Sequence, residues 1–162
     1  MTKSQFKMSM MGTIKNFMGL NILQSRQGIF INQDKYSRNL LEKFGMTSSS
    51  KLQVPVAVGT RLGPSLDKSV FDLTLYMSMI GSLLYLTVSR PDIMFIVCNC
   101  ARYQSNHKEP HLTARKNIFC YLKGTASLGL WYPSKTGFFI QSFLDANLGR
   151  FQLERKSSSG GC

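Results

Sequence analysis

The stretch FMGLNILQSRQGIFINQDKYSRNLLEKFG, residues 17–45, changes its hydrophobic pattern once, and that change decides the fold. Two short apolar runs, FMGLNIL and GIFIN, flank the polar, glycine-containing segment SRQG, which is typical of a β-hairpin turn. Beyond them Asp34 is placed to cap a helix that Gly45 would end. The apolar residues of this helix share one face: Tyr36, Leu40, Leu41 and Phe44. The stretch therefore predicts a hairpin followed by one amphipathic helix.

A long apolar stretch, residues 70–88, follows a connector at residues 47–68 that contains Ser, Gly and Pro and lacks periodicity. The segment SVFD at residues 69–72 has the spacing of a capping box, so it predicts a helix start. Pro91 and Asp92 suit the first turn of a second helix. A third helix is expected from Pro110 to Lys123, with Gly124 as its stop. The middle of the chain thus predicts a compact bundle of about three helices.

After Gly124 the pattern becomes that of strands. The segments LGLWY (128–132) and FFIQSFL (138–144) are rich in aromatic and branched residues, and a turn-like segment with Pro133 and Gly137 separates them. We expect these two segments to pair as a C-terminal β-hairpin. The predicted fold class is therefore α+β, with a hairpin at each end of a helical bundle.

The chain is strongly basic. Twenty Lys and Arg residues against 8 Asp and Glu give a net charge of +12, which attracts polyanions such as nucleic acid or an anionic membrane surface. The predicted nucleic-acid-binding residues, which lie near the aromatic residues Tyr121, Trp131 and Tyr132, are Arg115, Lys116, Lys123, Arg155 and Lys156. A solvated helix face with aromatic residues in the core would give the same pattern, and the sequence leaves both interpretations open.

The sequence does not support several other classes of protein, namely membrane-spanning, secreted and cysteine-ligated metal proteins. The longest uncharged run, residues 73–89, is marginal for crossing a bilayer and predicts a buried helix, so we expect no membrane partner. Residues 1–12 lack the pattern of a secretory signal. The four cysteines lack paired metal-site spacing, which favours reduced thiols in an intracellular protein of unknown compartment: Cys98, Cys100, Cys120 and Cys162. Of these, Cys98 and Cys100 are expected to act as small apolar residues.

Candidate catalytic side chains are few. Pro110 separates His107 from His111 at a helix start, so the two rings are not expected to share a metal, and a capping or surface role is predicted. The chain has neither a P-loop nor a G-x-G-x-x-G motif, and we expect no small-molecule substrate. Three acids stand at predicted helix starts: Asp34, Asp72 and Asp92. Asp145 ends the last predicted strand alone, without the cluster of carboxylates that two-metal chemistry needs.

Eight segments together resemble the Pol polyprotein of copia-type retrotransposons, where the reverse transcriptase runs into RNase H. They are FKMSMMG (6–12), FMGLNI (17–22), GIFINQDKY (28–36), MIGSLLYLT (79–87), SRPDI (89–93), YLKGT (121–125), GLWY (129–132) and ERKSSSGGC (154–162). The resemblance implies the end of a polymerase palm at residues 1–46, a linker at 47–68, a thumb and connection region at 69–124, and the truncated start of an RNase H-like domain at 125–162.

The resemblance also implies a role for Asp145. In this family the matching residue is the first of four carboxylates that hold two Mg²⁺ ions, and the other three would follow Cys162. The paired aspartates of the polymerase would precede the segment that resembles residues 6–12. We therefore expect a catalytically inactive chain in which Asp145 is a vestigial, incomplete metal site, with no productive cofactor and with residual affinity for RNA or DNA.

Departures from the family pattern also favour an inactive chain with only residual affinity for nucleic acid. Family arginines are replaced by Met77, Asn117 and Cys120, and a family aspartate is replaced by Asn147. Losing arginines from a nucleic-acid clamp weakens its phosphate contacts.

Two alternative functions remain open. In the first, the chain is a working nucleic-acid-binding module. In the second, it is a piece of an active RNA-directed DNA polymerase that another chain completes.

Overall fold

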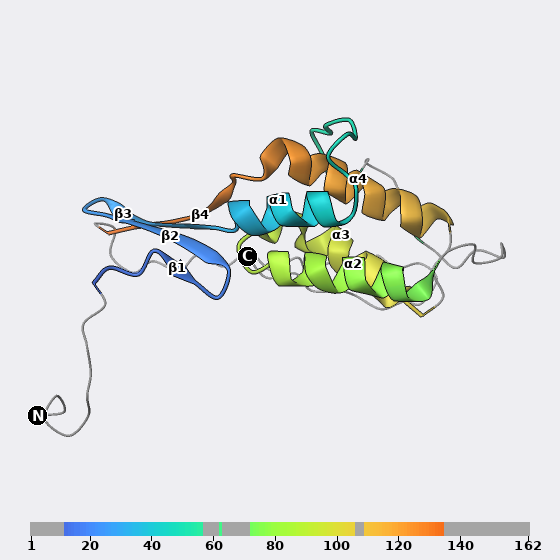
Figure 1. The fold of residues 1–162 in the computed structure, drawn as a ribbon, viewed down its shortest axis with the longest axis horizontal. Coiled ribbons are helices and arrows are strands. Elements are labelled where there is room, and N and C mark those ends of the chain that lie inside the picture. Colours follow the sequence, from blue (N-terminus) through green and yellow to red (C-terminus); the bar gives the residue numbers. More distant parts are fainter. Residues whose placement is uncertain (1–11, 57–61, 63–71, 106–108, 135–162) are drawn as a thin grey trace, which may run out of the picture.

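The structure is a computed structural model that describes residues 12–56, 62, 72–105 and 109–134. Within these ranges an antiparallel sheet extends from one end of a layer of packed helices (Figure 1). This arrangement confirms the predicted α+β class. Among the described residues, none of the helices combines the length and the apolar character that crossing a membrane requires.

The N-terminal hairpin forms as predicted. Strand β1 spans Asn16–Phe17, β2 spans Leu20–Ser25 and β3 spans Gly28–Asn32, and each pairs antiparallel with the next. The side chain of Ser25 closes the β2–β3 turn, because its Oγ accepts the N–H groups of Gln27 and Gly28, each at 3.2 Å. The polar segment SRQG thus supplies both the turn and the hydrogen bond that stabilises it.

Strand β4, Gly129–Pro133, confirms the strand predicted near residues 128–132 and completes the order β1-β2-β3-β4. Its partner is β3, with Phe30 opposite Trp131 and Ile31 opposite Leu130. The partner expected from the sequence, residues 138–144, lies outside the described residues. The pairing joins the two ends of the described chain in one sheet, across the boundary predicted at residue 125.

Four α-helices and one short 3-10 helix make up the described helical layer. They are α1 (Asp34–Lys43), α2 (Leu73–Leu86), η1 (Pro91–Ile93), α3 (Met94–Arg102) and α4 (Glu109–Thr125). Gly45 ends α1 as predicted, with a left-handed φ of +65°. Pro91 and Asp92 open η1, which leads directly into α3, so the helix start predicted there is confirmed as well.

The structure corrects three helix boundaries. Gln33 rather than Asp34 is the N-cap of α1, because Asp34 lies in the first turn and pairs with Arg38 at 3.0 Å instead. Helix α2 begins at Leu73, after Asp72 has accepted the N–H of Thr74 at 2.8 Å, so the aspartate supplies the cap itself. Helix α4 passes through Gly124, which does not adopt the left-handed conformation that would end it.

The core lies between the helices. Its completely buried aliphatic and phenylalanine side chains are Ile80, Leu83, Leu86, Ile93, Val97, Ile118, Phe119 and Leu122. Helix α1 packs on the same core, where the ring of Phe44 meets that of Phe119 edge to face at 5.5 Å. The N-terminal helix therefore belongs to one hydrophobic core with α2, α3 and α4. The stretch predicted to form a buried helix is α2, which buries one face and exposes the other.

Candidate nucleic-acid interface

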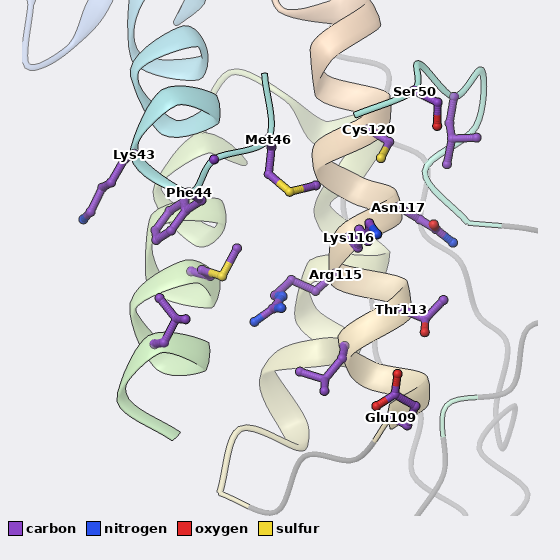
Figure 2. Close-up of a pocket in the computed structure, with 15 residues that line it drawn as sticks. Lys43, Phe44, Met46, Ser50, Glu109, Thr113, Arg115, Lys116, Asn117 and Cys120 are labelled. Carbon is purple, nitrogen blue, oxygen red and sulfur yellow. The ribbon is translucent and has the colours of Figure 1, made fainter. Parts of the chain in front are cut away.

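A hollow of about 860 Å³ lies where the C-terminal end of α1, the segment after it, α2 and α4 meet (Figure 2). We call it the basic hollow. Six of the residues that line it determine its character: Lys43, Phe44, Met46, Met79, Arg115 and Lys116. The hollow combines cationic side chains with apolar ones, which is the combination needed to hold a ligand that carries both an anion and a flat apolar face.

The segment after α1 is fastened to α4. The backbone N–H of Leu52 donates to the carbonyl of Cys120 at 3.2 Å, and Lys123 Nζ donates to the carbonyl of Ser49 at 2.6 Å. These two bonds hold residues 49–52 against the last two turns of α4. Ser50 and Leu52 of this segment line the hollow, so its border on this side is fixed to the helix. The predicted binding residue Lys123 is half-buried and serves this fastening.

Arg115 is the innermost cation of the basic hollow. Its side chain points into the hollow from α4 (Figure 2), and the residue is only 8% exposed. The guanidinium carbon lies 5.6 Å from the ring centroid of Tyr76, a cation–π contact. Burial lowers the pKa of Arg115, because desolvation penalises its charged form. Burial also raises the pKa of the Cys100 thiol to about 12, so this thiol stays neutral at physiological pH.

The predicted basic surface is therefore only partly assembled. The structure brings Arg115 and Lys116 to one hollow, Arg115 inside it and Lys116 exposed. Arg155, Lys156 and Asp145 lie outside the described residues. Sequence reasoning missed Lys43, which also lines the hollow; its side chain extends away from Arg115 (Figure 2), and its Nζ lies 5.2 Å from the ring centroid of Phe44.

The predicted aromatic neighbours lie elsewhere. Trp131 and Tyr132 are about half exposed on β4, beyond the C-terminal end of α4, whereas the basic hollow follows residues 109–120 of that helix. The hydroxyl of Tyr121 donates a hydrogen bond to Asp92 instead. The aromatic ring at the hollow is that of Phe44, and its signal in the sequence was its position between Lys43 and the helix-ending Gly45.

Two smaller predictions have different outcomes. His111 is completely buried and its ring lies 4.4 Å from that of Tyr103, so the predicted surface role was wrong for this residue, while His107 lies outside the described residues. It occupies the inward face of α4, next to buried Leu112. Cys98 is half-buried and Cys100 fully buried, as expected of small apolar residues. Within the part of the chain that the structure describes, no three His, Cys, Asp or Glu side chains converge as a metal ion would require.

Two of the segments that carry the resemblance, SRPDI and YLKGT, are in direct contact. Arg90 is almost completely buried and donates from Nε and Nη2 to the two carboxylate oxygens of Asp92 at 2.9 and 2.7 Å. Its Nη1 and Nη2 also reach the carbonyl and the hydroxyl of Thr125 at 2.7 and 2.9 Å. The hydroxyl of Tyr121 donates to Asp92 at 2.8 Å. We call these four residues the arginine clasp, which joins the start of η1 to the end of α4.

Other resemblance segments meet in the same way. The hydroxyl of Ser89 donates to the side-chain oxygen of buried Gln33 at 2.7 Å, and the hydroxyl of Tyr85 donates to the carbonyl of Met18. Tyr36 donates from its hydroxyl to the carbonyl of Ser82 at 3.2 Å. These motif residues therefore join the hairpin and α1 to the rest of the helices. Their role in the described part of the chain is to hold its elements together.

The arginine clasp predicts an acid-sensitive contribution to stability. Burial opposes ionisation of Asp92, but hydrogen bonds from Arg90 and Tyr121 outweigh it and lower the pKa of this carboxyl below its ordinary 3.8. A group with a depressed folded pKa stabilises the fold above its unfolded pKa and loses that contribution as pH falls through the folded pKa. The difference in melting temperature between the unmodified chain and Asp92→Asn should therefore shrink below pH 3.8. Thermal unfolding at several pH values measures it, and a difference that grows on acidification would contradict it.

Comparison with known proteins places these observations in a family. Residues 1–58 match the family described as reverse transcriptase (RNA-dependent DNA polymerase). The chain is 31% identical, over 98% of its length, to an uncharacterized mitochondrial protein of Arabidopsis thaliana. It is 28% identical over 89% of its length to the retrovirus-related Pol polyprotein from transposon RE1 of the same plant. The corresponding polyprotein from transposon TNT 1-94 of Nicotiana tabacum is 29% identical over 96% of the chain. No solved structure matches.

The family match and the two polyproteins thus identify a reverse-transcriptase-like domain similar to part of transposon Pol polyproteins. More narrowly, most of the chain is homologous to segments of the Pol polyproteins of copia-type retrotransposons, which confirms the resemblance seen in its motifs. It spans 66% of the mitochondrial relative, but only 10% of the RE1 polyprotein and 12% of the TNT 1-94 polyprotein.

Proposed function

We propose that this chain is a noncatalytic part of a retrotransposon reverse transcriptase that binds nucleic acid through the basic hollow. The observation that carries the proposal is the charge of the lining. Of the described residues around the hollow, Lys43, Arg115 and Lys116 are cationic and Glu109 is acidic. A concave surface with this excess of positive charge attracts phosphate groups and raises their local concentration.

The noncatalytic half of the proposal rests on the acidic residues of the sequence. Nucleotide addition and RNA cleavage by two metal ions both need several carboxylates on one site. The motif resemblance matches only Asp145, of the 8 Asp and Glu residues, to a metal carboxylate of the family. The purified chain should therefore neither extend a primer nor cleave an RNA–DNA hybrid in the presence of Mg²⁺. Turnover that copurifies with the chain and disappears in an Asp145→Asn variant would overturn this half of the proposal.

Removing two lysines of the hollow should weaken nucleic-acid binding. The double variant Lys43→Ala/Lys116→Ala removes two phosphate partners, so its affinity for a single-stranded oligonucleotide should fall about tenfold, and the slope of log K against log salt should decrease by roughly 1.4. Fluorescence anisotropy at several salt concentrations measures both quantities.

The matched control is Lys15→Ala/Lys35→Ala. Both of these lysines are exposed and lie outside the basic hollow, and the double variant loses the same total charge. Its affinity and salt slope should stay close to those of the unmodified chain. Equal losses in the two double variants would show that binding follows net charge rather than the hollow, and would contradict the proposed site.

A further inference from the structure

We infer that the basic hollow takes one unpaired nucleotide, so that the chain binds single strands in preference to duplexes. This inference rests on the proposed function. It adds that the bound nucleic acid is single-stranded and that one nucleotide enters the hollow as far as the buried Arg115. Three features of the hollow carry it: its size, the buried position of Arg115, and the apolar side chains beside that arginine.

The size suits a small group rather than a double helix. A volume of about 860 Å³ falls within the range of roughly 300–1,000 Å³ that pockets for small ligands occupy. A duplex presents its phosphates on a wide cylinder and keeps its bases stacked inside. It can contact the rim of such a hollow, but it can place a nucleotide inside only by unpairing it, which costs free energy. A single strand has no pairing to break.

The position of Arg115 requires insertion. Lys116 is exposed and can meet a phosphate at the surface, whereas Arg115 is 8% exposed and points into the hollow (Figure 2). An anion that contacts this guanidinium must enter the hollow with the part of the nucleotide attached to it. Glu109, the acid of the lining, lies six residues earlier on α4 (Figure 2), about 9 Å along the helix axis, so it does not face the same point.

The side chains next to Arg115 suit a base. Figure 2 shows Phe44 and Met46 on the same side of α4 as the Arg115 guanidinium, and Met79 of α2 also lines the hollow. Phe44 and Met46 are half-buried, so each still presents surface to an incoming ring. Aromatic rings stack on bases whatever their sequence, and thioethers pack favourably against aromatic faces. The hollow therefore offers an anion contact and an apolar surface side by side.

A direct test compares two forms of one oligonucleotide. A single strand that carries 2-aminopurine and the duplex of the same sequence are each titrated with the full chain at fixed salt. We expect the single strand to bind about tenfold more tightly, and its 2-aminopurine emission to rise as the base leaves the stack of the strand. The duplex should show neither the tighter binding nor the change in emission.

Two variants locate the contact. Arg115→Met removes the buried charge with little loss of volume, and Phe44→Leu removes the ring but keeps an apolar side chain. Each should lower single-strand affinity about tenfold and abolish the emission change. The controls are Arg26→Met and Phe95→Leu, which make the same replacements at exposed positions outside the hollow. Circular dichroism at the assay temperature checks that each variant is folded.

The outcomes separate the inference from the proposed function. If the chain binds neither single strands nor duplexes, both are overturned. If it binds both forms equally, and loses affinity in Lys43→Ala/Lys116→Ala but not in Arg115→Met, nucleic acid stays at the rim and the inference alone is overturned. If Arg115→Met does not fold, the comparison of single strand and duplex on the unmodified chain decides the question.

Discussion

Replacing Arg90 by Met is expected to lower the free energy of unfolding by about 3 kcal/mol, because breaking a buried ion pair costs roughly 3–5 kcal/mol. The arginine is 2% exposed and makes four hydrogen bonds, two to Asp92 and two to Thr125. The substitution leaves a carboxylate whose main partner is gone and a carbonyl at the end of α4 that loses its donor. Asp92 is about one-third exposed, so water compensates in part, which places the effect at the lower end of the range.

Urea denaturation of the full chain measures this change, with the midpoint and the slope fitted separately. The control is Arg38→Met, the same replacement at an exposed position whose ion pair with Asp34 spans one helical turn. That variant should leave the unfolding free energy almost unchanged, because exposed ion pairs contribute little. If the two substitutions cost the same, the arginine clasp does not hold η1 to α4 in the way the geometry indicates.

The local elements of this fold follow from local sequence. The turn at residues 25–28, the left-handed glycine after α1 and the proline that opens η1 each act within a few residues, so pattern alone could find them. The partner of β4 could not be found in that way. Residues 129–133 pair with β3, about a hundred residues earlier, and no periodicity in either segment specifies the other.

The basic hollow also combines a feature that local sequence could predict with one that depends on tertiary packing. Helical spacing places Arg115 on the apolar face of α4, since Leu112, Ile118 and Phe119 lie three or four residues away, so its burial could have been read from the pattern. The charge of Arg115 predicted a surface position instead, and that prediction was wrong. Lys43 reaches the same hollow from α1, over 70 residues earlier in the chain, and only the packing of α1 on α4 brings the two together.

The arginine clasp explains why motif segments can be recognised without being catalytic. SRPDI and YLKGT are separated by 27 residues of the chain, yet Tyr121 and Thr125 satisfy the polar groups of Arg90 and Asp92. A buried guanidinium needs several oxygen partners at once, so a change at one of these four positions leaves the others unsatisfied. Sequence comparison detects such a set as a motif, while its chemistry is structural.

A pair of glycine substitutions should move stability in opposite directions. Gly129→Ala is expected to cost about 2 kcal/mol, which is typical of overpacking. A Cβ at this position would overlap the carbonyl oxygen of Ile31 and lie 2.6 Å from the Cβ of Asn32, so β4 must shift away from β3. Gly81→Ala is expected to gain about 1 kcal/mol, because glycine inside a helix is less favourable than alanine by that amount. Gly81 is exposed in α2 and a Cβ there meets nothing within 4 Å.

Both variants add one methyl group, so a difference between their unfolding free energies comes from the position of that group. Urea denaturation gives the change in unfolding free energy, and hydrogen exchange at the amides of β3 and β4 shows where protection is lost. In Gly129→Ala the amides that join these two strands should exchange faster than those of β2, since the added atom meets the backbone of β3 itself. A Gly129→Ala variant as stable as the unmodified chain would mean that β4 does not occupy the edge of this sheet. The two ends of the described chain would then not share one sheet.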